Sequence, residues 1–205
     1  MQKPLAKYAN QKDFALCLER VRQGEAGASH QLVVAALPLV HGLLYRLGAR
    51  RHELDDLSQN VFLKCFASLP TFRGDSAFTT WLGGICVNTL SEHWRVRKRD
   101  SMHNPLHEGE LHLAAAPSQQ SDMVIAAREG LRAVHAILLR LKPKHRVSFV
   151  LHVLEELDVP TVAAMTNESV AATYKNIHRA RLMLESEAAK NSALRKFLDH
   201  GGAQP

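Results

Sequence analysis

Apolar residues recur at helical spacing along the first hundred residues. A short pattern that begins at Phe14 ends near Gly24, and a strongly apolar segment over residues 32–47 closes at Gly48. Residues 53–68 place one apolar stripe at 3-4-4 spacing, formed by Leu54, Leu57, Val61 and Cys65. This period is that of amphipathic helices, so the pattern predicts three helices that share a core.

A loop interrupts this pattern over residues 69–76, where Pro70, Gly74 and Asp75 break the period. Ser76 is a suitable N-cap for a further helix over about residues 77–99. That helix ends in a basic run, RVRKR. A glycine in the loop lets the backbone approach a ligand closely.

The loop and the helix after it have residues with two interpretations each. Phe72 either offers a face for stacking a base or packs in the core, and Asn88 either reads a base edge or lies on the helix surface. Trp81 is at helical spacing with Phe78 and Ile85, which favours a core position.

The second half of the chain is separated from the first by a change in pattern. Two prolines, an Ala triplet and the string SQQS interrupt any period over residues 100–122, which predicts a linker. Helical periodicity returns at 123 and continues to about 198. We therefore expect an all-α protein with two small helical domains, over residues 1–99 and 123–198, and a frayed tail over 199–205.

A helix-turn-helix pattern lies in the second domain. A short helix over 161–165, a tight turn over 166–168 and a capping Ser169 precede a helix that extends to about 186. Its expected inward residues are Val170, Thr173, Ile177, Ala180 and Leu184. Its expected outward residues are Tyr174, Lys175, His178 and Arg181, with Asn176 and Arg179 beside them. This is the layout of a DNA-recognition helix or of an ordinary αα-hairpin with a solvated polar face.

Composition and charge add a little to this picture. The chain of 205 residues has a net charge of +6 and a pI near 9.4, which fits a polyanionic partner. Four cations in seven residues fit either a solvated helix start or phosphate contacts: Arg140, Lys142, Lys144 and Arg146. The three cysteines are isolated in apolar contexts, which favours structural thiols over metal ligands.

Catalytic and metal-binding motifs are lacking in the sequence. There is no GxSxG, P-loop or HExxH string, and the twelve histidines show no compact ligand spacing. The pairs at 55–56 and 155–156 are adjacent in sequence, so their carboxylates point in different directions on a helix. We expect no enzyme activity, no cofactor and no metal site. Without an apolar leader or a run of about 18 apolar residues, we expect a soluble cytoplasmic protein.

Four segments together resemble the extracytoplasmic-function sigma factors of the sigma-70 family, the smallest class of bacterial RNA polymerase specificity subunit. The segments are ELDDLSQNVF at 53–62, FRGDSAFTTWL at 72–82, VNT at 87–89 and SVAATYKNIHRAR at 169–181. The likeness covers about residues 10–99 and 125–188. It implies that the first domain binds the polymerase β′ clamp and the promoter −10 element. The second would bind the β flap and the −35 element, with the linker directed toward the active site and RNA exit.

The resemblance also implies roles for individual residues. Those that would contact the clamp are Asp55, Asp56, Gln59 and Asn60. Those that would form a pocket for a flipped −10 base are Phe72, Arg73, Gly74, Asp75, Ser76 and Asn88, with Arg95, Arg97 and Lys98 on promoter phosphates. Those that would lie in or beside the −35 major groove are Tyr174, Lys175, Asn176, His178, Arg179 and Arg181. A partner anti-sigma factor, often membrane-anchored in this family, is also implied.

Several positions depart from the family pattern. Residues 83–84 are a Gly pair where an aromatic-basic pair is frequent, which predicts a weaker helix. Asn60 replaces a usual Glu, Glu156 stands where Gly is common, and residues 174–176 replace a triplet led by Arg or Lys. Two alternatives are a regulator that uses only its helix-turn-helix and a helical interaction protein without a DNA role.

Overall fold

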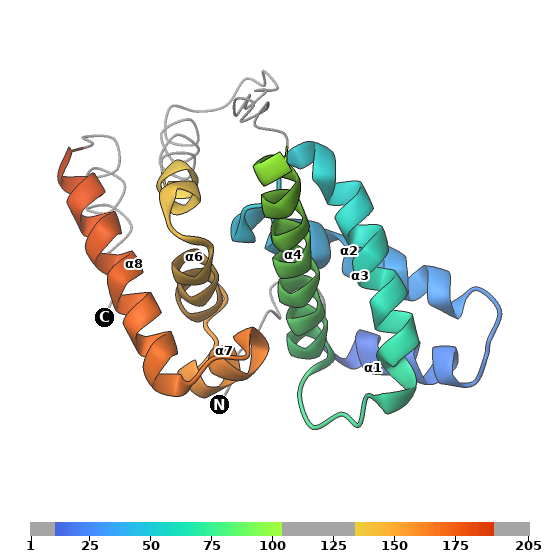
Figure 1. The fold of residues 1–205 in the computed structure, drawn as a ribbon. Helices are drawn as coiled ribbons and strands as arrows, with labels where there is room; N and C mark the ends of the chain where they lie inside the picture. Colours follow the sequence, from blue (N-terminus) through green and yellow to red (C-terminus); the bar gives the residue numbers. More distant parts are fainter. Residues whose placement is uncertain (1–10, 104–133, 191–205) are drawn as a thin grey trace, which may run out of the picture.

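The computed structural model describes residues 11–103 and 134–190, and the regular structure in these residues is helical. The first domain contains α1 (Gln11–Arg22), α2 (Ala28–Leu47), α3 (Leu54–Ser68) and α4 (Phe78–His103), with short 3-10 turns η1 (Arg51–Glu53) and η2 (Leu69–Thr71). The second contains a helical segment at 134–140, then α6 (Pro143–Phe149), the π-helical turn η3 (Val150–Leu154), α7 (Val159–Thr166) and α8 (Val170–Lys190). Figure 1 shows α6, α7 and α8 of the second domain on one side of α4 and α3 on its other side.

The predicted helices of the first domain are all present. The stripe on α3 points inward, with Leu57, Val61 and Cys65 buried and Leu54 half-buried. Burial raises the pKa of the Cys65 thiol to about 12 and also raises that of Cys86, which keeps both protonated. All three cysteines are free. The buried pair thus fills the core, as the structural-thiol interpretation predicts.

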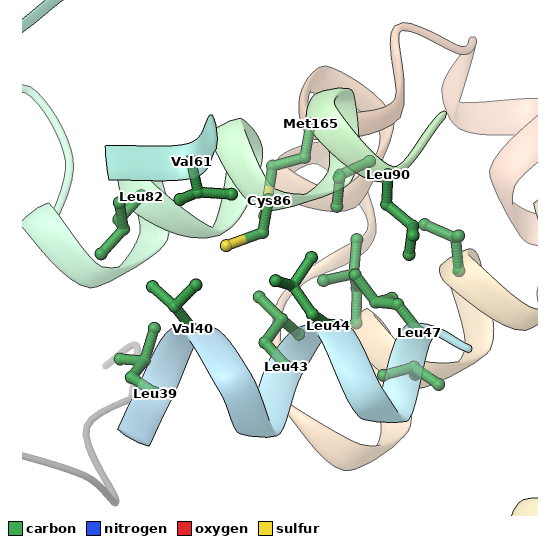
Figure 2. Packing of buried hydrophobic residues seen from close by; sticks show 14 of the residues in the cluster. Leu39, Val40, Leu43, Leu44, Leu47, Val61, Leu82, Cys86, Leu90 and Met165 are labelled. Atoms are coloured by element: carbon green, nitrogen blue, oxygen red, sulfur yellow. The ribbon is translucent and has the colours of Figure 1, made fainter. Parts of the chain in front are cut away.

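The apolar segment before Gly48 forms the central helix α2. Gly48 ends it with a φ of 107°, and its N–H bonds Leu44 O and Tyr45 O. By length and mean hydropathy (1.3) α2 could span a membrane, which corrects our expectation that the chain has no such segment. Its buried residues nevertheless pack into the core: Figure 2 shows Leu39, Val40, Leu43 and Leu44 directed toward α4. One buried face is what a core helix presents.

The second domain has the expected helix-turn-helix. Asp158 caps α7 by accepting a hydrogen bond from Thr161 N (2.8 Å), and Asn167 turns the chain with a φ of 54°. Ser169 Oγ accepts a hydrogen bond from Ala172 N (3.2 Å) at the start of α8, as predicted. Thr173, Ile177 and Ala180 are buried and Leu184 is half-buried. The expectation for Val170 is wrong: it is 43% exposed, because at the first position of α8 the core does not reach it.

Helix ends and the linker differ in part from the prediction. Helix α4 continues to His103, past the expected end at residue 99. The rest of the predicted linker and the start of the second domain, at 104–133, lie outside the described residues, as does the predicted tail.

One apolar cluster extends through both domains. It joins α2 and α4 of the first domain to Val147, Leu151, Val162 and Met165 of the second. Figure 2 shows Met165 of α7 beside Cys86 and Leu90 of α4. A Cβ at Gly84 would lie 3.9 Å from Met165 Cγ, an ordinary van der Waals distance, so α7 passes close to α4 at this position. Helix α4 continues through residues 83–84 without a break, although the Gly pair there predicts a weaker helix.

Candidate polymerase and nucleic-acid interface

The outer face of α3 presents the four residues predicted to contact polymerase. All four are exposed, opposite the buried stripe: Asp55, Asp56, Gln59 and Asn60. Leu63 lies one turn beyond Gln59 and Asn60 on the same side and is 62% exposed. Sequence reasoning missed Leu63. The available signal was an apolar residue outside the buried stripe of an amphipathic helix.

The glycine loop before α4 borders a small cavity of about 220 Å³. Phe72 is half-buried, with its ring centroid 4.8 Å from that of Trp81 and 6.0 Å from that of Phe78. Gly74 has a φ of 82°, a conformation that few other residues adopt. Both interpretations of Phe72 therefore hold in part, since it packs on the core aromatics and also lines the cavity.

Helix α1 completes the surroundings of this loop, which the sequence did not indicate. Phe14 and Leu18 line the same cavity as Phe72. Arg22 Nη2 donates a hydrogen bond to Phe72 O (2.6 Å) and so fixes the start of the loop. Arg73 and Asp75 are exposed and Ser76 lines the cavity. Only a fold that brings residue 22 against residue 72 reveals these contacts.

Asn88 is exposed on α4 but lines a different cavity, of about 480 Å³. Arg95 and Lys98 line it from the same helix, and Lys144 and Asn167 of the second domain line its other side. Phe72 and Asn88, predicted to share one base pocket, thus border two separate cavities in this arrangement of the domains.

The three cations predicted to hold phosphates differ in their contacts. Arg95 and Lys98 are exposed, whereas Arg97 Nη1 donates to Glu53 Oε1 (2.8 Å). Glu53 also lies 3.1 Å from His93 Nε2 and accepts from Arg50 N (2.8 Å). Burial by itself would raise the pKa of Glu53, but these hydrogen bonds and charges outweigh it and lower that pKa. Arg97 therefore ties α4 to the start of α3.

Helix α8 presents five of the six residues predicted for the −35 groove. Exposed along it are Tyr174, Lys175, His178, Arg179 and Arg181. Asn176 is only 3% exposed, and its Nδ2 donates to Glu168 in the turn. Residues 173, 176, 177 and 180 fall on the inward side at the helical period, which is why this amide faces inward. In this conformation it orients the turn.

The cation cluster at residues 140–146, which extends into α6, divides into three kinds of contact. Lys142 and Lys144 are exposed, and Arg140 Nη1 donates to Glu187 (2.6 Å). Arg146 is buried, so both the solvated and the phosphate interpretations are wrong for it. Burial lowers its pKa to about 10. Its partners are backbone carbonyls of both domains, which nothing in the local sequence indicates.

Within 11–103 and 134–190, no three His, Cys, Asp or Glu side chains come together as a metal ion would need.

Comparison with known families assigns both halves of the chain. Sigma-70 region 2 matches residues 32–100 and Sigma-70 region 4 matches residues 131–184. The chain is 29% identical over 177 residues to the ECF RNA polymerase sigma-E factor of Haemophilus influenzae, covering 83% of this chain and 92% of that protein. It is 29% identical over 169 residues to the RNA polymerase sigma-H factor of Pseudomonas aeruginosa, covering 80% and 88%.

The chain belongs to the extracytoplasmic-function sigma factors. This sigma factor is a transcription initiation factor, a specificity subunit of RNA polymerase. A regulator that uses only its helix-turn-helix is not favoured, because the region 2 match accounts for most of the first domain.

Solved structures share the fold of this sigma factor. It aligns with the sigma factor RpoE in its complex with the anti-sigma factor NepR from Bartonella quintana at a TM-score of 0.64 and 21% identity, over 82% of this chain and 99% of that one. It aligns with CnrH, in complex with the cytosolic domain of CnrY, at a TM-score of 0.59 and 23% identity, over 86% and 97%. The two-domain helical fold is thus that of the family.

Proposed function

We propose that this sigma factor binds core polymerase through α3, anchors the −35 element with α8 and captures a base of the −10 element with α4 and the glycine loop. The observation that supports it most is one face of α4. Asn88, Arg95 and Lys98 recur there at spacings of 7 and 3, and all three are exposed. An amide followed by two cations on one face suits a base edge and the phosphates beside it.

The energetics favour capture over chemistry. Taking a base out of the stack costs a few kcal/mol. Stacking on an aromatic ring returns about 1–3 kcal/mol per base, and Phe72 is one of the residues that line the glycine-loop cavity. Phosphate contacts from Arg95 and Lys98 add affinity that falls as salt rises. Polymerase supplies the catalysis, so the sigma factor itself breaks no bond.

Helix α8 supports the −35 assignment. Its exposed side chains combine hydrogen-bond donors with positive charge, and the turn before the helix is held by a hydrogen bond from the buried Asn176 to Glu168. A helix in this position of a helix-turn-helix enters the major groove of DNA. Its role here is to place the duplex so that the −10 element meets α4.

We further propose an anti-sigma partner in the cytoplasm. The sigma factor RpoE and CnrH were both solved with such partners, and the one bound to CnrH is a cytosolic domain. A membrane-anchored partner with a cytosolic segment fits this scheme. Copurification of the tagged sigma factor, followed by identification of a bound protein that blocks transcription, tests it. A chain recovered free of any inhibitor under all growth conditions would contradict it.

Run-off transcription tests the function as a whole. The sigma factor is added to core polymerase on a library of linear promoters, with core alone as the control. We expect transcripts from a narrow promoter set that share −35 and −10 sequences. Binding to DNA without any specific transcript would instead support a plain helix-turn-helix regulator, and the proposal would fail.

A further inference from the structure

The end of α2 is held by the second domain through three consecutive residues. Tyr45 stacks on His135, with ring centroids 4.2 Å apart and planes 11° apart, and Tyr45 O lies 3.1 Å from His135 Nε2. Arg46 Nε donates a hydrogen bond to Glu155 Oε1 (2.6 Å). Leu47 O accepts a hydrogen bond from a buried arginine of α6. Each of these groups belongs to one domain and its partner to the other.

Arg146 is that arginine, and it is 6% exposed at the boundary between the domains. Its Nε donates to Leu47 O (2.6 Å) at the C-terminal end of α2, where the helix dipole favours a cation. Its guanidinium carbon also lies 4.9 Å from the ring centroid of Trp94 on α4. A Cβ at Gly48 would lie 2.6 Å from that same carbon, so only glycine leaves room for this contact.

Glu155 supplies the charge that opposes Arg46. It is 6% exposed and its side chain lies on the second domain, while Arg46 is on the first. Buried ion pairs lose stability sharply when one partner is removed, because the other charge is left without compensation. This pair therefore depends on the domains remaining together.

The second domain lies across the face of α4 that we assign to the −10 element. Asn88, Arg95 and Lys98 open into the cavity of about 480 Å³, and the residues opposite them include Lys144 and Glu168. A phosphate backbone that follows this face would have to enter a cleft already walled by α6 and by the turn before α8.

We propose that the contact between the two domains is a self-inhibitory lock, in which Arg146 and the Arg46–Glu155 pair hold the −10 face of α4 shut in the free sigma factor. The proposal rests on the −10 assignment made above. A protein whose competent state is only a fraction of the population binds with an affinity reduced by that fraction. Core polymerase, which would bind the already exposed outer face of α3, would separate the domains, release the lock and expose the −10 face.

Charge reversal tests the lock. Arg46→Glu and Glu155→Arg each place like charges together at the contact, whereas the double exchange restores an opposite pair. Each variant is measured for radius of gyration by X-ray scattering. Each is also measured for binding to a labelled −10 single strand taken from the run-off screen. We expect both single variants to expand and to bind about tenfold more tightly, and the double exchange to reverse both effects.

The two single variants change the net charge in opposite directions, so a gain in both cannot come from general attraction to DNA. The matched control is the pair formed by Arg140 and Glu187, which has the same residue types and lies within the second domain. Arg140→Glu and Glu187→Arg should leave both readings unchanged. Absence of expansion in the single variants would overturn the lock. Expansion without tighter binding would overturn the occlusion, and Asn88→Ala in the polymerase complex then shows separately whether the −10 assignment also fails.

A covalent version keeps the proposal testable if the reversed variants fold poorly. Gly84→Cys and Met165→Cys, combined with Cys17→Ser, place two thiols at the contact between α4 and α7. We expect the joined form to lose −10 strand binding and run-off transcription, and a reducing agent to restore both. Full activity of the joined form would contradict the lock.

Discussion

Asn88 has the most specific expected role of any single side chain in the first domain. It is exposed on α4, in line with Arg95 and Lys98, and its amide can both donate to and accept from a base edge. The residue lies on α4 and the proposed polymerase-binding residues lie on the outer face of α3, so its two candidate effects are separable.

Replacement of this amide is therefore expected to affect one step only. Asn88→Ala should slow open-complex formation by about tenfold or more, since a lost base contact is worth about 1–3 kcal/mol, and should leave core binding unchanged. Permanganate footprinting of the melted strand and a core-binding titration measure the two steps. Gln31→Ala, an exposed amide on α2 that lines neither cavity, is the control. Equal loss in both steps, or in neither, would remove Asn88 from the pocket.

Glu156 shows how a departure from a family pattern becomes a structural feature. It has a φ of 57°, in the left-handed region that costs a residue with a side chain roughly 1–2 kcal/mol. The sequence resemblance placed a glycine preference at this position, and the backbone explains it.

Relief of this strain should stabilise the second domain. Glu156→Gly is expected to raise the free energy of unfolding by about 1 kcal/mol, the strain removed less the entropy that glycine adds. Urea unfolding followed by circular dichroism measures it. Asn167→Gly is the comparison, because Asn167 has a φ of 54° but asparagine tolerates that region, so its gain should be smaller. A loss of stability in Glu156→Gly would mean that the carboxylate contributes more than the strain costs.

Helix α3 presents a composite surface rather than a purely polar one. The predicted polar residues are exposed, and Leu63 extends them by one turn. Exposed apolar surface that is rimmed by polar residues marks protein–protein contact sites.

Loss of that leucine should therefore weaken polymerase binding. Leu63→Ser is expected to raise the dissociation constant for core polymerase by about tenfold with no change in folding, because the side chain is exposed. Fluorescence anisotropy with labelled sigma factor measures the affinity. Leu16→Ser, at an equally exposed leucine of α1 (64%), should have no effect. If both substitutions act alike, the effect is general and the surface is not specific.

Helix α8 supports a prediction about sequence preference rather than overall affinity. Lys175 is exposed in the middle of the expected groove contact. Lys175→Ala should change the order of preference among −35 variants by about 1–3 kcal/mol at one base position. Competition binding over a set of −35 variants measures this, with Lys190→Ala at the far end of α8 as the control. A uniform loss across all variants would assign Lys175 to phosphate contact only.

Sequence signals within a few residues, such as helix caps and apolar periods, predicted most of the helices. They did not predict the contacts between helices. Gly48, Ser169 and the stripe on α3 each act within a few residues, and the helices begin and end close to where these signals place them. The inward position of Asn176 also follows the helical period, but its polarity favoured an outward assignment. The hydrogen bond from Arg22 to Phe72 O joins residues 50 positions apart in the chain, so no local pattern could predict it.

The two domains form one packed unit across their boundary in this conformation. The apolar cluster continues from α2 and α4 into α7, and Arg146 bonds carbonyls on both sides. The predicted two-domain organisation is correct, yet the sequence favoured a solvated or phosphate-binding Arg146. Its burial depends on the end of α2, because Leu47, whose carbonyl accepts its hydrogen bond, lies 99 residues earlier in the chain.

Substitution of Arg146 should reveal how far the domains unfold together. Arg146→Leu keeps apolar volume but removes the donors to Leu47 O, and a buried acceptor left without a partner costs about 1–3 kcal/mol. We expect a lower unfolding midpoint and a broader or two-step transition, as the domains lose their coupling. Calorimetry measures both. Lys144→Leu, exposed on the same helix, is the control; identical behaviour of the two variants would show that Arg146 does not couple the domains.

Gly48 gives a criterion for comparing this chain with its relatives. Because any methyl group there would collide with the guanidinium at 2.6 Å, a homologue with a larger residue at this site cannot seat an arginine at the equivalent of 146 in the same way. Paired substitution of the two sites across the family would mark which sigma factors restrain themselves and which depend wholly on an external inhibitor.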